Sequence, residues 1–328
     1  MHTSKILGTG HFVPDQIYTN LYMTTLFETS DQWITERTGI KERRIADPKK
    51  DEFPSTMAAH ASQIALKNAG LDKNEVDMII FSSTMSDYSF PNSATLLQDL
   101  LGIENKCACI DLNAACTGWI YGLVMANSLI ETGVYKNILI VGSETTSSYN
   151  NWKDRSKSVL FGDGCGAIVL SRSDNENSKI HHSILSSDSS KKDDLIKKTG
   201  MARSPFFIDS ESPDIVEMNG ASVFKAAVKT MASQCASILS KAELSKDQID
   251  LFIPHQANMR IIEAVANRFE FPKDKVFINV DKYANTSSAS IPIALSEAVD
   301  AGRLKRGDKL LLTAFGSGLT SGTILLTY

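Results

Sequence analysis

The pattern of apolar and polar positions divides the chain into short apolar runs and longer segments whose apolar residues recur every three or four positions. Apolar runs of about four to eight residues are typical of buried strands, and the wider spacing is typical of amphipathic helices. Residues 5–14 (KILGTGHFVP) predict a short strand followed by a glycine turn. We further predict strands at 76–82, 107–112, 137–142 and 167–170, helices at 31–39, 54–69 and 93–101, and a helix beginning at Cys116.

The second half of the chain repeats the order of the first. The segment AGLDKNEVDMIIF, from Ala69, resembles AELSKDQIDLFIP, from Ala242. Further along, ETG ending at Gly133 resembles DAG ending at Gly302, at nearly the same separation along the chain. Near-constant separations in an unchanged order indicate a duplicated unit. Strands that alternate with helices favour α/β layers with mostly parallel sheets.

The repeat predicts two halves, residues 1–175 and 176–328, packed as a pseudo-symmetric pair. A stretch at residues 186–216 interrupts the pattern, with charged residues at 191–194 and an apolar segment at 205–207. Long ordered loops are often functional. We therefore predict that this stretch is an inserted loop that serves as a lid.

Composition and charge exclude several classes of function. The chain has 328 residues, which is typical of two units of about 150 residues each. A formal net charge of −4 gives no reason to expect a nucleic-acid partner. No apolar run approaches the roughly 20 residues that a membrane span needs. The N-terminal segment is too short, and too interrupted by glycine and proline, for a signal peptide. We therefore expect a cytoplasmic protein without a membrane anchor.

The five cysteines predict neither a disulfide framework nor a metal site. Their odd number and the expected cytoplasmic location argue against disulfides. Cys107 and Cys109 share one face of a predicted strand, but no second ligand pair lies at a spacing that suits zinc. Core packing is the better account of both. His181 and His182 lie in a polar stretch, where solvated side chains are expected.

Cys116 differs from the other cysteines because it follows an apolar run and a turn of small residues and opens a predicted helix. Unpaired N–H groups and the helix dipole favour a thiolate at a helix N-terminus. The small neighbours Ala114, Ala115 and Gly118 leave room for a substrate. A buried structural cysteine is the alternative, and Cys116 alone leaves it open.

Two residues of the second half are the predicted partners of Cys116. At the separation that relates Gly133 to Gly302, Cys116 aligns with Asn285, so one strand-to-helix corner bears a thiol and the other an amide. His255 follows the predicted strand IDLFIP, near the sheet end that also holds Cys116. A lone histidine after a strand is usually structural. Three such residues at equivalent positions of a duplicated unit instead favour a nucleophile with hydrogen-bonding partners.

Seven segments together resemble the β-ketoacyl-acyl carrier protein synthases III of the thiolase-like superfamily. They are ILGTGHFVP, TSDQWITERTGIKERRIA, DLNAACTGWIYGL, LFGDGCGAIVLS, IPHQANMRII, ANTSSASIP and FGSGLTSG, and they extend from residue 6 to residue 322. The resemblance implies an α/β, five-layered αβαβα thiolase-like fold of two duplicated halves, and a homodimer. It also implies an acyltransferase without a cofactor, which condenses an acyl-coenzyme A primer with malonyl-acyl carrier protein and initiates fatty-acid synthesis.

The resemblance also implies how the reaction is divided among the residues. Cys116 takes the acyl group from acyl-coenzyme A, and malonyl-acyl carrier protein then loses carbon dioxide and attacks the acyl-cysteine as an enolate. His255 Nε2–H and the Asn285 amide are neutral donors that stabilise the enolate oxygen. No strong base is required, because decarboxylation supplies the carbanion. The backbone N–H groups of Cys116 and Ser317 form the oxyanion hole of the acylation step.

The same resemblance implies contacts with coenzyme A, with the carrier protein and across the dimer. Coenzyme A is held at its adenine end and along its pantetheine arm by Trp33, Arg37, Arg155 and Asn258. The acidic carrier protein meets Arg260 and Lys225, although an exposed basic residue is often only a solvated charge. Phe90 reaches across the dimer and closes the acyl pocket of the partner.

The chain departs from the family pattern at four positions near the expected site. A glycine, a tryptophan, a second glycine and an asparagine of the family are replaced here by Ser317, Ser321, Ala284 and Ala221. These changes leave open a synthase-III-like acyltransferase of a specialised-metabolite pathway. A non-catalytic dimer partner is disfavoured because Cys116 is present, and a papain-like cysteine hydrolase because that fold lacks the duplication.

Overall fold

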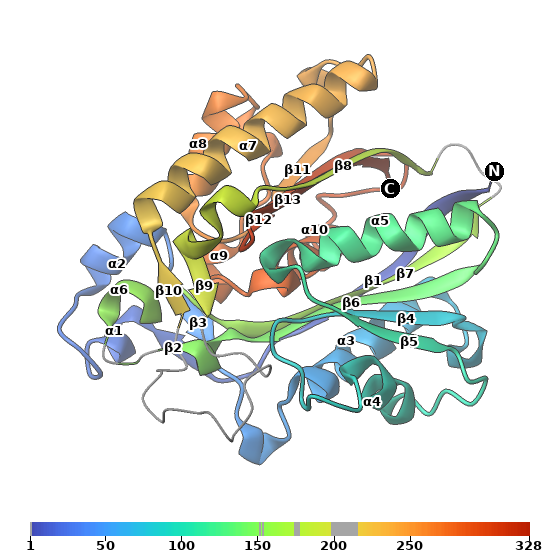
Figure 1. Cartoon of the computed structure of the whole chain (residues 1–328), viewed down its shortest axis with the longest axis horizontal. Helices are drawn as coiled ribbons and strands as arrows, with labels where there is room; N and C mark the ends of the chain where they lie inside the picture. Colours follow the sequence, from blue (N-terminus) through green and yellow to red (C-terminus); the bar gives the residue numbers. More distant parts are fainter. Residues whose placement is uncertain (1, 151, 153, 174–177, 198–215) are drawn as a thin grey trace.

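The computed structural model of the chain describes residues 2–150, 152, 154–173, 178–197 and 216–328. Within these residues, two large sheets are stacked, with helices on the outer face of each and a further pair of helices between them (Figure 1). The layers therefore follow the order αβαβα, and the predicted fold class is confirmed.

The first sheet belongs to the N-terminal half and has the strand order β1-β7-β6-β4-β5. Strand β4 pairs in parallel with β5 and with β6, whereas β7 pairs antiparallel with β6 and with β1. Its five strands contain or overlap all the strands predicted for this half: β1 (Thr3–Phe12), β4 (Met78–Ser82), β5 (Ala108–Leu112), β6 (Asn137–Thr145) and β7 (Asp163–Ser173).

The second sheet has the order β11-β12-β13-β8, with strands β8 (Ile180–Ser187), β11 (Leu251–Pro254), β12 (Lys309–Gly316) and β13 (Thr320–Thr327). Only β11 and β12 pair in parallel. The prediction of mostly parallel sheets is therefore wrong, since both sheets are mixed. Three residues separate β12 from β13, and a connection this short can join antiparallel strands but cannot form a parallel crossover.

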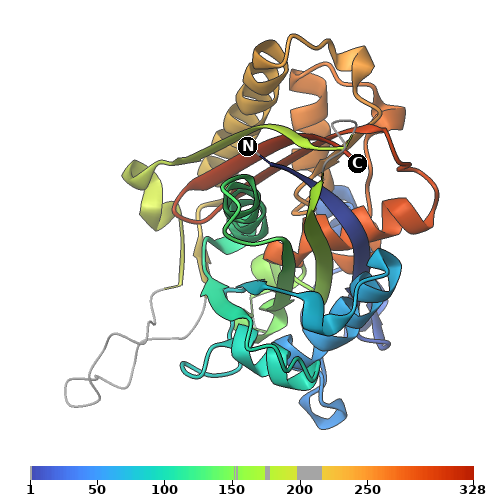
Figure 2. The ribbon, with the colours of Figure 1, turned by 90° about the vertical axis from the view of Figure 1, so that its right-hand side faces the viewer.

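Three pairs of helices form the α layers, and Figure 2 shows α5 nearly end-on between the sheets. Helix α3 illustrates the local signals, because Pro54 stands at its first position and Gly70 ends it in the left-handed conformation at φ 62°. The helices are α3 (Pro54–Ala69) and α4 (Ser93–Leu100) outside the first sheet, α5 (Gly118–Glu131) and α10 (Ser290–Asp300) between the sheets, and α7 (Gly220–Lys241) and α8 (Met259–Arg268) outside the second.

Shorter elements complete the described chain. Strands β2 and β3 pair with each other, as do β9 and β10. These elements are α1 (Asn20–Met23), α2 (Asp31–Thr38), α6 (Arg155–Ser158), α9 (Val280–Tyr283), β2 (Ile17–Thr19), β3 (Glu42–Arg44), β9 (Leu195–Lys197) and β10 (Val216–Met218). Helix α2 confirms the helix predicted at residues 31–39.

The glycines of β1 serve packing rather than a turn. The strand continues without interruption from Thr3 to Phe12, through the predicted turn. A Cβ atom at Gly8 would lie 2.3 Å from the carbonyl oxygen of Ala65, and one at Gly10 would lie 2.3 Å from that of Ala61. The backbone of α3 therefore lies directly against β1, which only glycine permits at these two positions.

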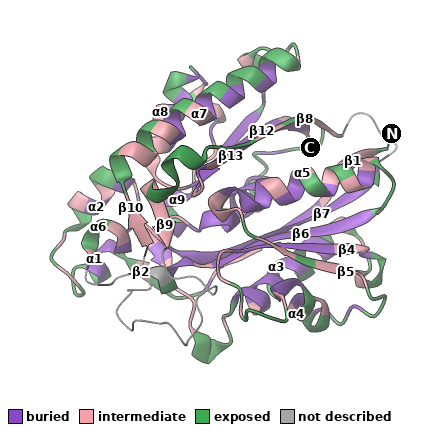
Figure 3. Cartoon of the chain, viewed as in Figure 1, coloured by how far each residue is buried: buried purple, intermediate pink, exposed green. Residues whose placement is uncertain are grey.

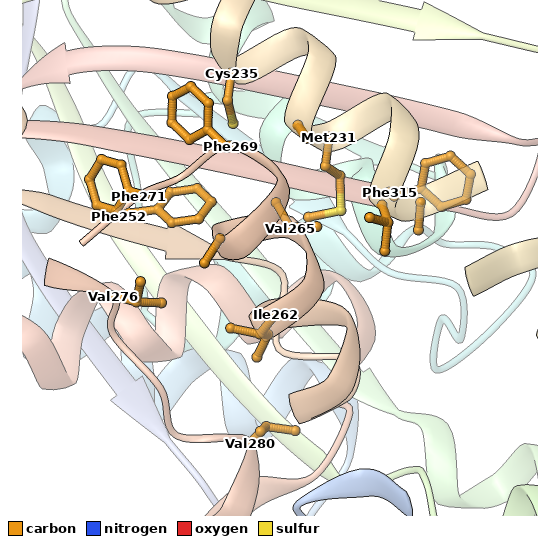
Figure 4. Close-up of a cluster of buried hydrophobic side chains, with 14 of the residues drawn as sticks. Met231, Cys235, Phe252, Ile262, Val265, Phe269, Phe271, Val276, Val280 and Phe315 are labelled. Atoms are coloured by element: carbon orange, nitrogen blue, oxygen red, sulfur yellow. The ribbon is translucent and has the colours of Figure 1, made fainter. Parts of the chain in front are cut away.

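Three apolar cores separate the layers. One lies between α3, α4 and the first sheet, and a second surrounds α5 and α10 between the sheets. The third fills the space under α7 and α8, where Met231 and Cys235 of α7 lie close to Val265 and Phe269 (Figure 4). Figure 3 shows buried residues on the strands and on the helix faces that meet them. The two large sheets are thus bound into one body through the middle helices.

Candidate active site

Two corresponding corners of the duplicated halves precede the middle helices. A short 3₁₀ turn, η3 (Ala115–Thr117), leads into α5, and another, η9 (Ser287–Ala289), leads into α10. The first residue of each turn has positive φ, 48° for Ala115 and 50° for Ser287, so the second residues, Cys116 and Ser288, correspond to each other. The predicted equivalence of Cys116 with Asn285 is wrong, because α5 is three residues longer than α10 and the separation measured after the helices does not hold before them.

A cavity of about 1280 Å³ brings the predicted chemistry together. Cys116, His255, Asn285 and Ser317 all line it, although they come from four separate parts of the chain. Residues predicted to bind substrate line the same cavity, and these are Trp33, Arg37, Asn258 and Arg260. The convergence of thiol, imidazole and amide that the sequence predicted is therefore present in the structure.

The Cys116 thiol is neutral at physiological pH. Burial raises its pKa to about 11, and the nearby carboxylate of Glu144 acts in the same direction. Ser287 Oγ donates a hydrogen bond to Cys116 Sγ at 3.5 Å, which favours the thiolate but does not outweigh burial. The thiolate expected from the helix N-terminus is therefore not the resting form of this cysteine.

Glu144, at the end of β6, is a buried carboxylate that the sequence analysis did not identify. Its Oε2 accepts hydrogen bonds from Thr84 N at 3.0 Å and Thr84 Oγ1 at 2.7 Å, and its Oε1 accepts one from Ser288 Oγ at 2.7 Å. Burial raises its pKa. Glu144 thus joins the loop after β4, which lines the cavity, to the corner before α10. A carboxylate two residues after the predicted apolar strand 137–142 was the available signal.

His255 follows β11, and its backbone N–H bonds to the carbonyl oxygen of Thr313 at 2.8 Å. The residue is only 4% exposed, and burial lowers its pKa to about 4. Its Nδ1 lies 2.6 Å from Ser290 Oγ, at the first residue of α10. The imidazole is therefore neutral at physiological pH.

Asn285 is fixed by its backbone and by its own side chain. Its N–H donates to the carbonyl oxygen of Leu160 at 2.9 Å, and its carbonyl oxygen accepts from Gly162 N–H at 3.1 Å. The side-chain Oδ1 accepts from Ser287 N–H at 2.9 Å. The acceptor end of the amide is thus occupied, which leaves the NH₂ group as the end available to the cavity.

Ser317 follows β12 and lies beside the start of the nucleophile's helix. A Cβ atom at the preceding Gly316 would lie only 2.9 Å from the Cys116 backbone nitrogen, so the end of β12 approaches this backbone closely. Thr320 Oγ1 and Thr117 Oγ1, 2.8 Å apart, join the two segments. This proximity fits the predicted pairing of the Cys116 and Ser317 N–H groups.

The residues predicted to hold coenzyme A form one group at Trp33. The Arg37 guanidinium lies 4.7 Å from the centre of the Trp33 ring, and that of Arg155 lies 5.0 Å from it. Arg155 does not line the cavity but donates to the carbonyl oxygen of Glu28 at 2.7 Å. Asn258 caps α8, and its Nδ2 donates to the carbonyl oxygen of Arg37 at 3.2 Å.

Besides Arg155, two predicted residues lie outside the cavity. Phe90 is 86% exposed, and Lys225 is exposed on α7. The predicted lid at residues 186–216 is described only in part, where β9 and β10 supply Leu195 and Val216 to the cavity. Residues 205–207 lie outside the described residues.

The departures from the family pattern have different surroundings. Ser321 is 3% exposed, and its Oγ bonds to Ser186 Oγ at 2.8 Å and to Gln234 Nε2 at 2.9 Å, so a polar cluster stands at the family's tryptophan position. Ala284 has φ 57°, a backbone conformation that favours the glycine usual in the family. Ala221 lines the cavity, where its short side chain leaves more space than asparagine.

Three further properties concern metal ligands, membrane helices and the cysteines. No group of three or more His, Cys, Asp or Glu side chains among the described residues could hold a metal ion. No helix in the described ranges has the length and apolar character to cross a membrane. All five cysteines have free thiols.

Comparisons with known proteins give one family. Residues 110–189 match the model described as 3-oxoacyl-(acyl-carrier-protein) synthase III, and residues 239–328 match its C-terminal counterpart. The chain is 44% identical to the β-ketoacyl-(acyl-carrier-protein) synthase III of Natranaerobius thermophilus over 100% of both chains. Solved structures of 3-oxoacyl-(acyl-carrier-protein) synthase III from Aquifex aeolicus and β-ketoacyl-(acyl carrier protein) synthase III from Thermus thermophilus are similar, with TM-scores of 0.92 and 0.91 and identities of 42% and 40%. These matches cover 99% of the chain, with 100% of the first structure and 99% of the second.

Proposed function

Because the chain belongs to the family of β-ketoacyl-acyl carrier protein synthases III, we propose that it condenses an acyl-coenzyme A primer with malonyl-acyl carrier protein and so initiates fatty-acid synthesis. The observation that carries the proposal is the convergence of Cys116, His255 and Asn285 on one large cavity. Near-full-length identities of 44%, 45% and 42% to synthases III support the same conclusion. The alternative, a synthase-III-like enzyme of a specialised-metabolite pathway, has no such support.

In the first step, Cys116 Sγ attacks the thioester carbonyl of acyl-coenzyme A. The carbon–sulfur bond to coenzyme A breaks, a new thioester forms at Cys116, and the thiol proton is transferred to the departing coenzyme A sulfur. The oxygen of the tetrahedral intermediate carries negative charge, which backbone N–H groups of Cys116 and Ser317 stabilise. Since the resting thiol has a pKa of about 11, its deprotonation is part of this step.

In the second step, malonyl-acyl carrier protein loses carbon dioxide, and the bonding electrons form an enolate at the remaining thioester. The enolate carbon attacks the acyl-Cys116 carbonyl and releases the cysteine sulfur, which regains a proton from solvent. The product is a β-ketoacyl-acyl carrier protein. The His255 ring, with a pKa of about 4, and the Asn285 NH₂ group are neutral donors to the enolate oxygen, so neither carries a charge that must be removed after the reaction.

The substrate contacts are part of the same proposal. Trp33 and Arg37 stack on and neutralise the nucleotide of coenzyme A, and Arg155 supports them through its own contact with the Trp33 ring. Asn258, which lines the cavity and donates a hydrogen bond to the Arg37 carbonyl oxygen, contacts the pantetheine arm. Arg260, exposed at the start of α8, and Lys225, on α7, meet the acidic carrier protein.

We also propose a homodimer formed along β5, the edge strand of the first sheet. An edge strand offers unpaired backbone groups to a further strand, and Ile110 on β5 is 37% exposed. Tyr88 and Phe90, in the loop before α4, are 62% and 86% exposed. A second copy against this edge covers these apolar side chains and allows Phe90 to close the partner's acyl pocket.

The proposed reaction needs no cofactor beyond its substrates. The carbanion comes from decarboxylation, and the covalent intermediate is held by Cys116. A cytoplasmic location belongs to the same proposal, because coenzyme A thioesters and carrier-protein thioesters are consumed where they are made. The five free thiols fit a reducing compartment.

A panel of acyl-coenzyme A thioesters tests the proposed function. Each is incubated with the protein, and the mass of the intact chain is recorded before and after malonyl-acyl carrier protein is added. We expect one primer class to acylate Cys116 and the adduct to disappear as β-ketoacyl-acyl carrier protein forms. Acylation that ends in hydrolysis, with no carrier-bound product, would show that the chain is a thioesterase instead.

A further inference from the structure

The tautomer of a buried neutral histidine decides what its ring can do. A neutral imidazole carries one N–H donor and one acceptor nitrogen, and the partner of one nitrogen determines the role of the other. When a carboxylate accepts from Nδ1–H, as in a serine-protease triad, Nε2 is left as a base. When a donor faces Nδ1, Nε2 keeps the proton and becomes the donor. The residue opposite His255 Nδ1 is therefore decisive.

Ser290 faces His255 Nδ1. Its Oγ lies 2.6 Å from the ring nitrogen, and the two residues are 2% and 4% exposed. The backbone N–H of Gln256 points at the same hydroxyl oxygen, at 3.4 Å. A hydroxyl that accepts from this N–H has its single proton free to donate to Nδ1. Among the described residues the Ser290 hydroxyl has no acceptor other than Nδ1, so its proton is used in a hydrogen bond when Nδ1 is the acceptor.

We propose that Ser290 is a positioning residue that holds His255 in the Nε2–H tautomer and so makes its ring a hydrogen-bond donor to the cavity. The inference rests on the proposed function for its catalytic consequence, but the tautomer itself does not depend on it. Within the described residues, the only side chain hydrogen-bonded to the His255 ring is that of Ser290. With a hydroxyl in place of a carboxylate, nothing on this side of the ring stabilises an imidazolium.

The chain contains a matched pair that can serve as a control. Ser296, on the same helix α10, places its Oγ 2.9 Å from Nδ1 of His11, and Ser296 is 1% exposed. His11 does not line the cavity, and the Asp300 carboxylate lies 3.9 Å from the same Nδ1. Removal of the Ser296 hydroxyl therefore costs a buried serine–histidine hydrogen bond on α10 without changing the partner of His255.

The experiment compares Ser290→Ala, Ser290→Thr and Ser296→Ala with the wild-type chain. Histidine labelled with nitrogen-15 reports the tautomer of each of the six histidines, and His255→Gln identifies the signal of His255 by its loss. We expect the Nε2–H form in the wild type, a mixture of tautomers in Ser290→Ala, restoration in Ser290→Thr, and no change at His255 in Ser296→Ala.

The activity readout follows the same variants. Carbon dioxide release from malonyl-acyl carrier protein should fall about tenfold in Ser290→Ala, the loss expected for one hydrogen bond of about 1.4 kcal/mol. Acyl-Cys116 formation should stay within about twofold, and Ser290→Thr should restore most of the decarboxylation.

A wild-type signal of the Nδ1–H form, or an unchanged tautomer in Ser290→Ala, would overturn the inference whatever the activity. Equal losses of acylation and decarboxylation in Ser290→Ala would reduce Ser290 to a packing role. If the wild type releases no carbon dioxide at all, the proposed function fails, and the nitrogen-15 spectrum still decides the tautomer.

Discussion

The corner before α5 and the corner before α10 have similar backbone conformations but carry different side-chain groups. Each begins with a residue of positive φ, 48° or 50°, passes through a 3₁₀ turn and starts a buried helix. In the proposed reaction the first corner supplies the reacting atom, Cys116 Sγ. The second supplies hydroxyls that each bond to a different group, with Ser287 to Cys116, Ser288 to Glu144 and Ser290 to His255. The two corners thus share a backbone conformation, while the proposed nucleophile lies in the first and the hydroxyls that contact the site residues lie in the second.

Removal of the Cys116 thiol should distinguish the proposed contributions of the two corners most clearly. We expect Cys116→Ala to abolish acylation and condensation while measurable decarboxylation of malonyl-acyl carrier protein remains, because only the transfer step needs the sulfur. Parallel measurement of carbon dioxide release and intact mass provides the test. Cys107→Ala, which lies just before β5 and outside the cavity, is the matched control. If Cys116→Ala also stops carbon dioxide release, the corners do not act separately.

Loss of the Asn285 amide should have the opposite effect. Asn285→Ala removes a donor to the enolate oxygen, and the loss of one such donor typically costs about 10²–10³ in rate. Decarboxylation should therefore fall by this factor while the acyl-enzyme still forms. Asn127→Ala removes a hydrogen-bonded amide outside the cavity and should leave both rates unchanged. Normal carbon dioxide release from Asn285→Ala would assign the enolate to other donors.

The neutral histidine predicts a dependence of stability on pH. The pKa of His255 falls from 6.5 to about 4 on folding, so between these values the unfolded chain binds a proton that the folded chain does not. The contribution of His255 to the free energy of unfolding is fully present above pH 6.5. About 3 kcal/mol of that free energy is lost as the pH falls to about 4. Urea unfolding of His255→Gln and the wild type across this range should show the difference, and parallel curves would contradict it.

A smaller effect is expected outside both corners, at the residues proposed to bind coenzyme A. Arg37→Ala should raise KM for acyl-coenzyme A about tenfold and change that for malonyl-acyl carrier protein less than about twofold, because Arg37 stacks on Trp33 and meets only the nucleotide. The difference should shrink at high salt. Lys50→Ala removes an exposed positive charge outside the cavity and serves as the control. Equal changes for both substrates would give Arg37 another role.

The smallest expected effect concerns the carboxylate that lies between the corners. Glu144 raises the pKa of Cys116, so Glu144→Gln should lower that pKa and increase the rate of Cys116 alkylation by iodoacetamide a few-fold near pH 8. In the wild type the rate should keep rising with pH towards about 11. An unchanged rate in Glu144→Gln would show that burial alone suppresses the thiolate.

The sequence was sufficient for the strands of the first sheet, for several helices of the first half and for the three side chains that meet in the cavity. Periodicity located α2, α3 and α4, and the repeat with the family motifs led to Cys116, His255 and Asn285. The glycines of β1 were interpreted as a turn because glycine is favoured both in turns and where a helix backbone lies close to a strand. Cys116 was aligned with Asn285 by the residue separation between Gly133 and Gly302, which follow α5 and α10. That separation does not reveal that α5 is longer than α10, so the alignment was wrong for residues that precede the helices.

The hydroxyl partners and the state of the thiol could not be predicted from the sequence. Ser287, Ser288 and Ser290 stand in the run NTSSASIP, where nothing distinguishes the hydroxyl that faces sulfur from those that face a carboxylate or an imidazole. The pKa of Cys116 depends on its burial and on Glu144, which joins the site only through tertiary folding. The boundary between the halves at residue 175 stays a prediction, since residues 174–177 lie outside the described ranges.

The shared middle layer constrains how the molecule can fold. Helix α5 comes from the first half and α10 from the second, yet each packs against strands of both sheets. Trp119 and Leu295, which are almost fully buried in the core between the sheets, would be exposed if either half were synthesised alone. We expect fragments ending or starting near residue 175 to be aggregation-prone when made separately and to recover structure when co-expressed. We therefore expect that neither half folds independently and that the cavity, whose lining comes from both halves, forms only when both are present.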